Sequence, residues 1–155
     1  MANAAMAAAA KKSVEELLGR PTSLFDLYRQ FYECPADTEL TTQFIKERIE
    51  NNESDIFLAI EGDSANGFLQ LYPSYCSVQA IKIYILYDLY VEQRYRKRGI
   101  AKSLMNKASQ WAKENGALRL DLLTAKTNTA GQHLYEKLGY KKVNQEFHAY
   151  SLDVE

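Results

Sequence analysis

Residues 91–101, V-E-Q-R-Y-R-K-R-G-I-A, combine the residue types that can hold a phosphate group. A basic turn and a glycine stand directly before a run with helical spacing of apolar residues, which begins at Ile100. The first N–H groups of a helix lack partners within the helix and carry a partial positive charge, and a glycine lets a ligand approach them. The segment therefore predicts an anion site, with phosphate as the expected guest.

The charge pattern of this region supports an anion site. Residues 93–113 contain seven basic residues and no acid, although the whole chain has a formal net charge of −1. The positive charge is thus local and coincides with the predicted helix start. The alternative is a solvated basic helix face, and one short motif does not decide between the two.

A second segment, residues 128–140, reads N-T-A-G-Q-H-L-Y-E-K-L-G-Y at the start of a further expected helix. Together the two segments resemble the motifs of the GNAT superfamily of N-acetyltransferases. The first family motif is Arg or Gln, two residues, Gly, one residue, then Gly or Ala. The second is an Asn seven residues before the Tyr of a Leu-Tyr-x-x-x-Gly-Tyr/Phe run. The matching residues are Arg96, Gly99 and Ala101 for the first motif, and Asn128, Leu134, Tyr135, Gly139 and Tyr140 for the second.

The elements that position these motifs follow from the hydrophobic periodicity. We expect helices after Pro21 and over residues 38–51, 99–115 and 128–138, and strands over residues 56–60, 67–72, 79–91, 118–124, 140–143 and 147–152. In the strand 79–91, Tyr84 and Asp88 fall on one parity and hence on one expected face. Residues 1–12 are expected to form a disordered or helical tail, and residues 13–155 a single domain.

The resemblance implies an α/β fold in which about four helices flank a mixed, mostly antiparallel sheet of six to seven strands. Family members usually open with a strand of the kind Ile-Arg-x-Ala, which residues 7–13 do not offer. The first strand is therefore missing or replaced by another segment. A sheet edge left open in this way would favour a homodimer.

The reaction implied by the resemblance is acetyl transfer from acetyl-coenzyme A to an amine. The cofactor's pyrophosphate would bind the backbone of the basic turn, and its peptide-like arm would pair with the end of the preceding strand. Asn128 would cap its helix and also bind the cofactor arm. The cofactor-binding residues are then Leu89, Tyr90, Val91, Arg96, Lys97, Arg98, Gly99, Ile100, Ala101, Lys102, Asn128 and Tyr135.

Two residues are expected to move protons. Tyr135 matches the family's general acid, since a phenol stays protonated at neutral pH. Asp88 is the candidate base, because a carboxylate in an apolar strand is costly unless it has a task or a partner. The alternative is a structural role, in which Asp88 forms a salt bridge or a hydrogen bond to the loops. Glu92 is less suited because the neighbouring arginines would lower its pKa, and His148 would serve only if the last strand lined the cleft.

Aromatic residues are concentrated around the expected amine side of the site. Rings suit a cationic amine, with ordinary core packing as the alternative. The candidate substrate-binding residues are Tyr28, Tyr32, Tyr72, Tyr84 and Asp88. The run D-L-Y-V before the basic turn is similar to that of the diamine acetyltransferases, although Tyr87 stands where they have a second acid.

These features predict transfer to a primary amine of a small molecule, such as a polyamine or an amino acid, by direct attack in a ternary complex. Neither motif contains a cysteine, so an acetyl-enzyme intermediate is not favoured. Two alternatives remain open. One is an acetyltransferase for protein N-termini or lysines, and the other is a non-catalytic module that binds coenzyme A.

Composition narrows the remaining classes. The near-neutral charge argues against a nucleic-acid binder, and no apolar run approaches the ~20 residues of a membrane span. Cys34 and Cys76 lie far apart in the sequence, which argues against a disulfide framework and a zinc site, and no metal is expected. We therefore expect a cytoplasmic protein.

Overall fold

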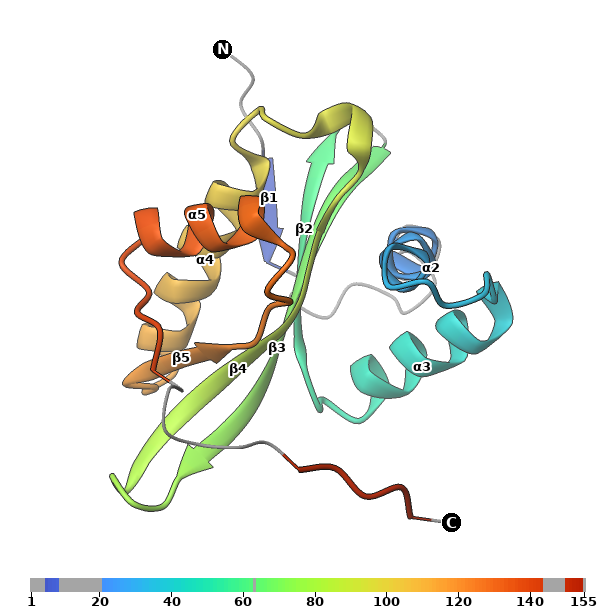
Figure 1. Cartoon of the computed structure of the whole chain (residues 1–155). Helices are drawn as coiled ribbons and strands as arrows, with labels where there is room; N and C mark the ends of the chain where they lie inside the picture. Colours follow the sequence, from blue (N-terminus) through green and yellow to red (C-terminus); the bar gives the residue numbers. More distant parts are fainter. Residues whose placement is uncertain (1–4, 9–20, 63, 144–149, 155) are drawn as a thin grey trace. The chain divides into compact units, whose positions relative to one another are not determined.

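The computed structural model describes residues 5–8, 21–62, 64–143 and 150–154 (Figure 1). The chain forms two compact units, Met1–Leu123 and Thr124–Glu155. The first unit contains a five-stranded sheet in the order β1-β2-β3-β4-β5. Its strands are β1 (Ala5–Ala8), β2 (Asp55–Glu61), β3 (Ser64–Cys76), β4 (Ile81–Val91) and β5 (Arg119–Leu122). The pairs β1–β2, β2–β3 and β3–β4 are antiparallel, and β5 runs parallel to β4.

Helices cover both faces of this sheet (Figure 1). α2 (Pro21–Phe31) and α3 (Thr38–Glu50) pack on one face, and α4 (Ile100–Glu114) packs on the other. The α2/α3 face holds a buried cluster of Leu24, Phe25, Ile45, Ile56, Leu58 and Phe68. On the α4 face, the rings of Phe57 and Trp111 meet edge to face at 6.0 Å. Both faces are therefore buried, as the largely apolar strands predict.

A bulge interrupts the pairing of β3 with β4. Gln70 lies opposite Asp88, but the next residue of β3, Leu71, lies opposite Leu86, so Tyr87 has no partner residue in β3. One inserted residue reverses the alternation of side chains beyond it. Asp88 therefore lies on the α2/α3 face, whereas Tyr84, opposite Pro73, lies on the α4 face.

This arrangement corrects the prediction that Tyr84 and Asp88 share a face. The prediction was wrong because both parities of the strand are apolar or aromatic, so a shift of one residue leaves no mark in the hydrophobic pattern.

The described residues form five strands, so the predicted six to seven strands are not reached in this part of the chain. Residues 140–143, predicted as a strand, have no strand pairing, and residues 141–143 are exposed. The other predicted C-terminal strand, residues 147–152, lies partly outside the described residues, and its described part is not a strand.

The N-terminal segment also differs from the prediction. Four residues of the expected disordered or helical tail form β1, which pairs with β2 and occupies the edge where the family's first strand was thought to be missing. The rest of residues 1–12 lies outside the described residues. β1 thus occupies this edge of β2 and is itself the outer strand of the described sheet.

The second unit contains α5 (Thr129–Lys137), whose N-cap is Asn128. Along the parts of the chain that the structure describes, we find no helix with the length and apolar character that a membrane crossing requires.

Candidate active site

The basic turn ends in a strained backbone that opens the start of α4. After a single 3-10 turn, η1 (Gln93–Tyr95), the chain passes through Lys97 at φ 62° and Gly99 at φ 81°, both left-handed. Gly99 is the N-cap of α4 and has no side chain to satisfy the first N–H groups of the helix. A Cβ added at Gly99 would meet no atom within 4 Å. The helix start is thus accessible and provides the donors that a phosphate group needs.

The basic side chains of the turn have different partners. Arg94 pairs with Glu92 at 2.6 Å, which leaves Glu92 occupied as the sequence predicts. Arg96 Nε donates to the carbonyl of Val91 at 2.9 Å, and its guanidinium lies 5.6 Å from the ring of Tyr90. Arg96 therefore fastens the turn to the end of β4. The side chains of Lys97, Arg98 and Lys102 are exposed beside the helix start.

The end of β4 leaves one backbone edge without a strand partner. β5 pairs with β4 only from Ile83 to Leu86, whereas β3 continues to pair with β4 up to Val91. Residues 87–91 therefore lack a strand neighbour on the β5 side in the described part of the chain. This edge can accept an extended peptide-like chain by backbone pairing.

Asp88 is a buried carboxylate, with 7% of its surface exposed. Its Oδ2 accepts a hydrogen bond of 2.7 Å from Gln70 Nε2. Burial raises the pKa of the Asp88 carboxyl, and hydrogen bonds from Gln70 and Tyr28 oppose that rise. Among the described residues, the hydrogen-bond partners of Asp88 are the neutral side chains of Gln70 and Tyr28.

Gln70, the partner of Asp88, forms two further hydrogen bonds. Gln70 is fully buried, and its Nε2 also donates to the hydroxyl of Tyr72 at 2.7 Å. Its Oε1 accepts a hydrogen bond of 3.0 Å from Ser54 Oγ. Burial and the charge of Asp88 raise the pKa of Tyr72 to about 12, so Tyr72 is a neutral phenol.

Three of the four predicted substrate tyrosines lie on the α2/α3 face. The hydroxyl of Tyr28 donates to the carbonyl of Tyr87 at 3.2 Å and links α2 to β4. Tyr28 meets the ring of Tyr32 at 5.2 Å, and Tyr72 meets the ring of Tyr87 at 5.4 Å, both edge to face. Tyr84 is on the other face, where its ring lies beneath Lys82.

Sequence reasoning missed Gln70. A buried amide within the apolar run F-L-Q-L-Y carries the same signal that singled out Asp88 in β4. His148, the alternative base, lies outside the described residues.

In the second unit, the second motif forms the start of α5. Asn128 Oδ1 accepts from the N–H of Gly131 at 3.1 Å, and Asn128 Nδ2 donates to Thr124 Oγ1 at 3.1 Å. Tyr135, half-buried, has its ring centroid 6.1 Å from that of Tyr140. Burial raises the pKa of Tyr140 to about 12, and within the described residues its hydroxyl has no hydrogen-bond partner.

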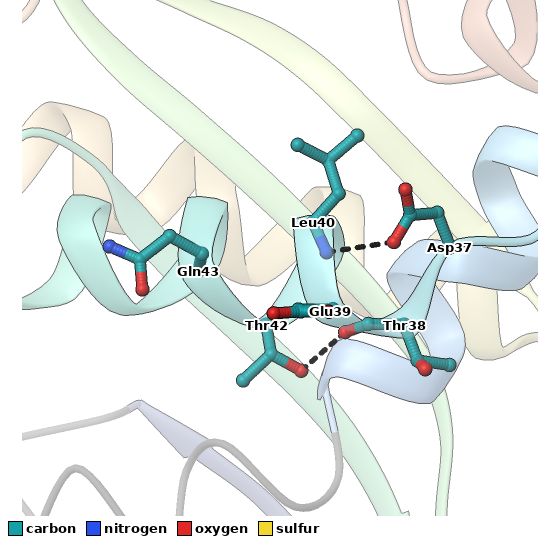
Figure 2. A pocket seen from close by; sticks show the side chains of 6 residues that line it. All are labelled: Asp37, Thr38, Glu39, Leu40, Thr42 and Gln43. Carbon is teal, nitrogen blue, oxygen red and sulfur yellow. Dashed lines mark hydrogen bonds between the residues drawn. The ribbon is translucent and has the colours of Figure 1, made fainter.

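A hollow at the start of α3 is formed without any residue of β3 or β4. Figure 2 shows its lining, Asp37, Thr38, Glu39, Leu40, Thr42 and Gln43. Asp37 caps the helix by accepting from the N–H of Leu40 at 2.9 Å, and Thr42 bonds the carbonyl of Thr38. These contacts are those of an ordinary helix start.

The chain is similar to a known family of proteins. Residues 22–140 match the model described as "Acetyltransferase (GNAT) family". A Bacillus subtilis (strain 168) protein described as "Uncharacterized N-acetyltransferase YhfO" is 41% identical over 119 residues, which are 77% of this chain and 80% of the relative. A Haemophilus influenzae (strain ATCC 51907 / DSM 11121 / KW20 / Rd) protein described as "Probable acetyltransferase" is 34% identical over 57% of this chain and 61% of the relative.

A solved structure gives the same result. The crystal structure described as that of "a probable acetyltransferase" has a TM-score of 0.83 and 34% identity, and the match covers 97% of each chain. The accessible helix start after the basic turn suits the phosphates of the family's cofactor. The chain therefore belongs to the GNAT family of acetyltransferases and is an acyltransferase that uses acetyl-CoA.

Proposed function

We propose that this enzyme acetylates a primary amine of a small molecule by direct attack within a ternary complex. The observation that carries the proposal is the buried carboxylate of Asp88 on the face covered by α2 and α3. Tyr28 supports a small acceptor, because its hydrogen bond to Tyr87 ties α2 to β4 where a protein substrate would need an open groove.

Acetyl-CoA supplies the activated acetyl group. Backbone N–H groups of Gly99 to Lys102 are suited to its pyrophosphate, with the exposed Lys97, Arg98 and Lys102 adding positive charge. No described strand pairs with Leu89 to Val91 on the β5 side, and this edge is suited to the amide groups of its arm. Asn128, after capping α5, keeps hydrogen-bonding capacity for the same arm.

Asp88 binds the ammonium form of the acceptor and takes up its proton, which leaves the amine nitrogen free to attack the acetyl carbon. A carboxyl group with a raised pKa is a stronger base than an ordinary aspartate. Tyr28, Tyr32 and Tyr72 supply the neutral rings that favour a cationic guest.

Tyr135 donates its hydroxyl proton to the sulfur when the carbon–sulfur bond breaks. The amine nitrogen loses its second proton as the amide forms, and that proton restores the Tyr135 hydroxyl. The products are the amide and the free thiol, and the proton held by Asp88 returns to solvent. Tyr135 comes from the second unit, and its assignment rests on its place in the second motif. The family match runs across the boundary of the two units, which supports one catalytic domain over residues 13–155.

The Tyr135→Phe variant tests this assignment. It removes the proton donor and keeps the ring, so kcat for free-thiol release should fall by about 10²-fold or more while the Kd for coenzyme A stays unchanged. Tyr75→Phe is the matched control, because Tyr75 lies exposed near the end of β3 and should keep full activity. Full turnover by Tyr135→Phe would remove Tyr135 from the proposed mechanism.

A further inference from the structure

Gln70 is a buried amide that the fold does not require. It lies on β3 with 0% of its surface exposed, between residues of a hydrophobic sheet. A polar group in such a position is costly unless its hydrogen bonds are complete, and an apolar side chain of similar length would fill the same space. Gln70 therefore needs a reason beyond packing.

The contacts of Gln70 fix which way its amide points. An ionised carboxylate can only accept, so the NH₂ group must face Asp88, where Nε2 lies 2.7 Å from Oδ2. The carbonyl end then faces Ser54, whose hydroxyl donates to Oε1 at 3.0 Å. The same NH₂ group also donates to Tyr72 at 2.7 Å. Ser54, Gln70 and Asp88 form a directed chain of hydrogen bonds.

We propose that Gln70 is a positioning residue that holds Asp88 ready to take a proton on Oδ1. The NH₂ group of Gln70 cannot accept a hydrogen bond, so a proton on Oδ2 would face a donor and lose the contact. The proton leaving the amine therefore goes to Oδ1, and the bond from Gln70 favours the ionised form of the carboxylate. This inference rests on the proposed role of Asp88.

The charged groups of the neighbouring elements have contacts of their own. Tyr28 comes from α2, and Tyr72 from β3. Arg48 of α3 pairs with Glu53, and on β5 Arg119 pairs with Asp121 at 2.8 Å. Arg96 lies over Tyr90. Gln70 and Tyr28 are neutral, so the bond of either to Asp88 can be removed without changing a charge, and of the two only Gln70 lies on the strand beside Asp88.

The Gln70→Met variant tests the proposal, because methionine keeps the length of the side chain and lacks the donor. The Asp88 carboxyl is followed by NMR in protein carrying ¹³C-labelled aspartate, and kcat/KM is measured across pH. Loss of the hydrogen bond should raise the pKa of Asp88 above its wild-type value, and kcat/KM should fall about tenfold at pH values below the new pKa. The acid limb of the profile should move to higher pH.

Controls separate this effect from a structural defect. Gln43→Met changes an exposed glutamine of α3 that bonds Glu47, and should leave the profile unchanged. Gln70→Asn, whose amide is too short to reach Asp88, should shift the profile in the same direction as Gln70→Met and serves if the methionine variant does not fold. An Asp88 titration that is the same in these variants as in the wild type would overturn the proposal.

The result is also distinguishable from failure of the proposed function. If Asp88→Asn keeps full turnover, Asp88 is not the base and the proposed mechanism fails, whatever Gln70 does. If Asp88→Asn loses turnover but the pKa of Asp88 is the same in Gln70→Met as in the wild type, only the role of Gln70 fails. The NMR titration needs no acceptor amine, so it gives an answer for the protein alone.

Discussion

Asp88 holds a carboxylate in the interior with neutral partners, Gln70 and Tyr28. Burial disfavours its charged form, and this raises its pKa in the folded protein relative to the unfolded chain. Between those two pKa values the folded state binds more protons than the unfolded state, so the free energy of unfolding falls as the pH rises. A group that serves as a base in this way reduces stability at neutral pH.

Asp88→Asn should therefore change how stability depends on pH. Asparagine keeps an oxygen that can accept from Gln70 and carries no charge, so the variant lacks the fall in stability that accompanies ionisation of Asp88. The Tm of the variant minus that of the wild type should become more positive as the pH rises above 3.8, the ordinary pKa of aspartate, until Asp88 is ionised in the folded protein. Thermal melts over a series of pH values measure this difference. A difference that stays constant with pH would show that Asp88 has an ordinary pKa.

At the scale of the element, the start of α4 depends on the left-handed backbone of Gly99, at φ 81°. The space around the glycine is open, so a substitution there acts through backbone strain and not through a clash. Strain of this kind costs roughly 1–2 kcal/mol for a residue with a Cβ. In a variant with a Cβ at this position, the backbone would relieve this strain by leaving the conformation that exposes the first N–H groups of α4.

Gly99→Ala should lower the free energy of unfolding by about 1–2 kcal/mol and weaken coenzyme A binding by about tenfold, because the binding conformation must be restored at that cost. Gly62→Ala is the matched control, since Gly62 is also left-handed at φ 60° and also has open space around it, but lies in the turn after β2. Denaturant unfolding and calorimetry should show a similar loss of stability in both variants and weaker binding only in Gly99→Ala. Unchanged binding in Gly99→Ala would separate the helix start from the cofactor.

The elements differ in how far the sequence determines them. β2, β4 and the four described helices lie close to their predicted bounds because their apolar spacing is strong. β1 has no such pattern, since it is A-M-A-A, and it exists through pairing with β2. The bulge at Tyr87 could not be predicted from the sequence, because it depends on the register with β3 and not on hydropathy.

The same limits apply to the site. The sequence places Asp88 with Tyr28 and Tyr72, and the structure brings these three to one face. The sequence also groups Tyr84 with these residues as an aromatic, but the bulge at Tyr87 puts Tyr84 on the other face. Gln70 was missed because a single amide has no motif, and only its hydrogen bonds show what it does.

At the scale of the whole molecule, the charge distribution matches the proposed ligands. The chain has a formal net charge of −1, so neither ligand is attracted by the overall charge. The exposed bases before and within the start of α4 suit the phosphates of the cofactor, and the buried carboxylate of Asp88 suits a cationic amine. The positive charge near α4 thus favours the cofactor, and the negative charge of Asp88 favours the amine.

Transfer to a small amine is tested by the release of free thiol from acetyl-CoA, measured against a panel of polyamines, amino acids, aminoglycosides and short peptides. The thermal shift caused by coenzyme A is recorded on the same protein, where saturation at 100 times Kd should stabilise the fold by about 2.7 kcal/mol. We expect coenzyme A to raise the Tm, and we expect free thiol to be released only when a small amine is present. Release only with peptides, or a thermal shift without release for any acceptor, would contradict this expectation.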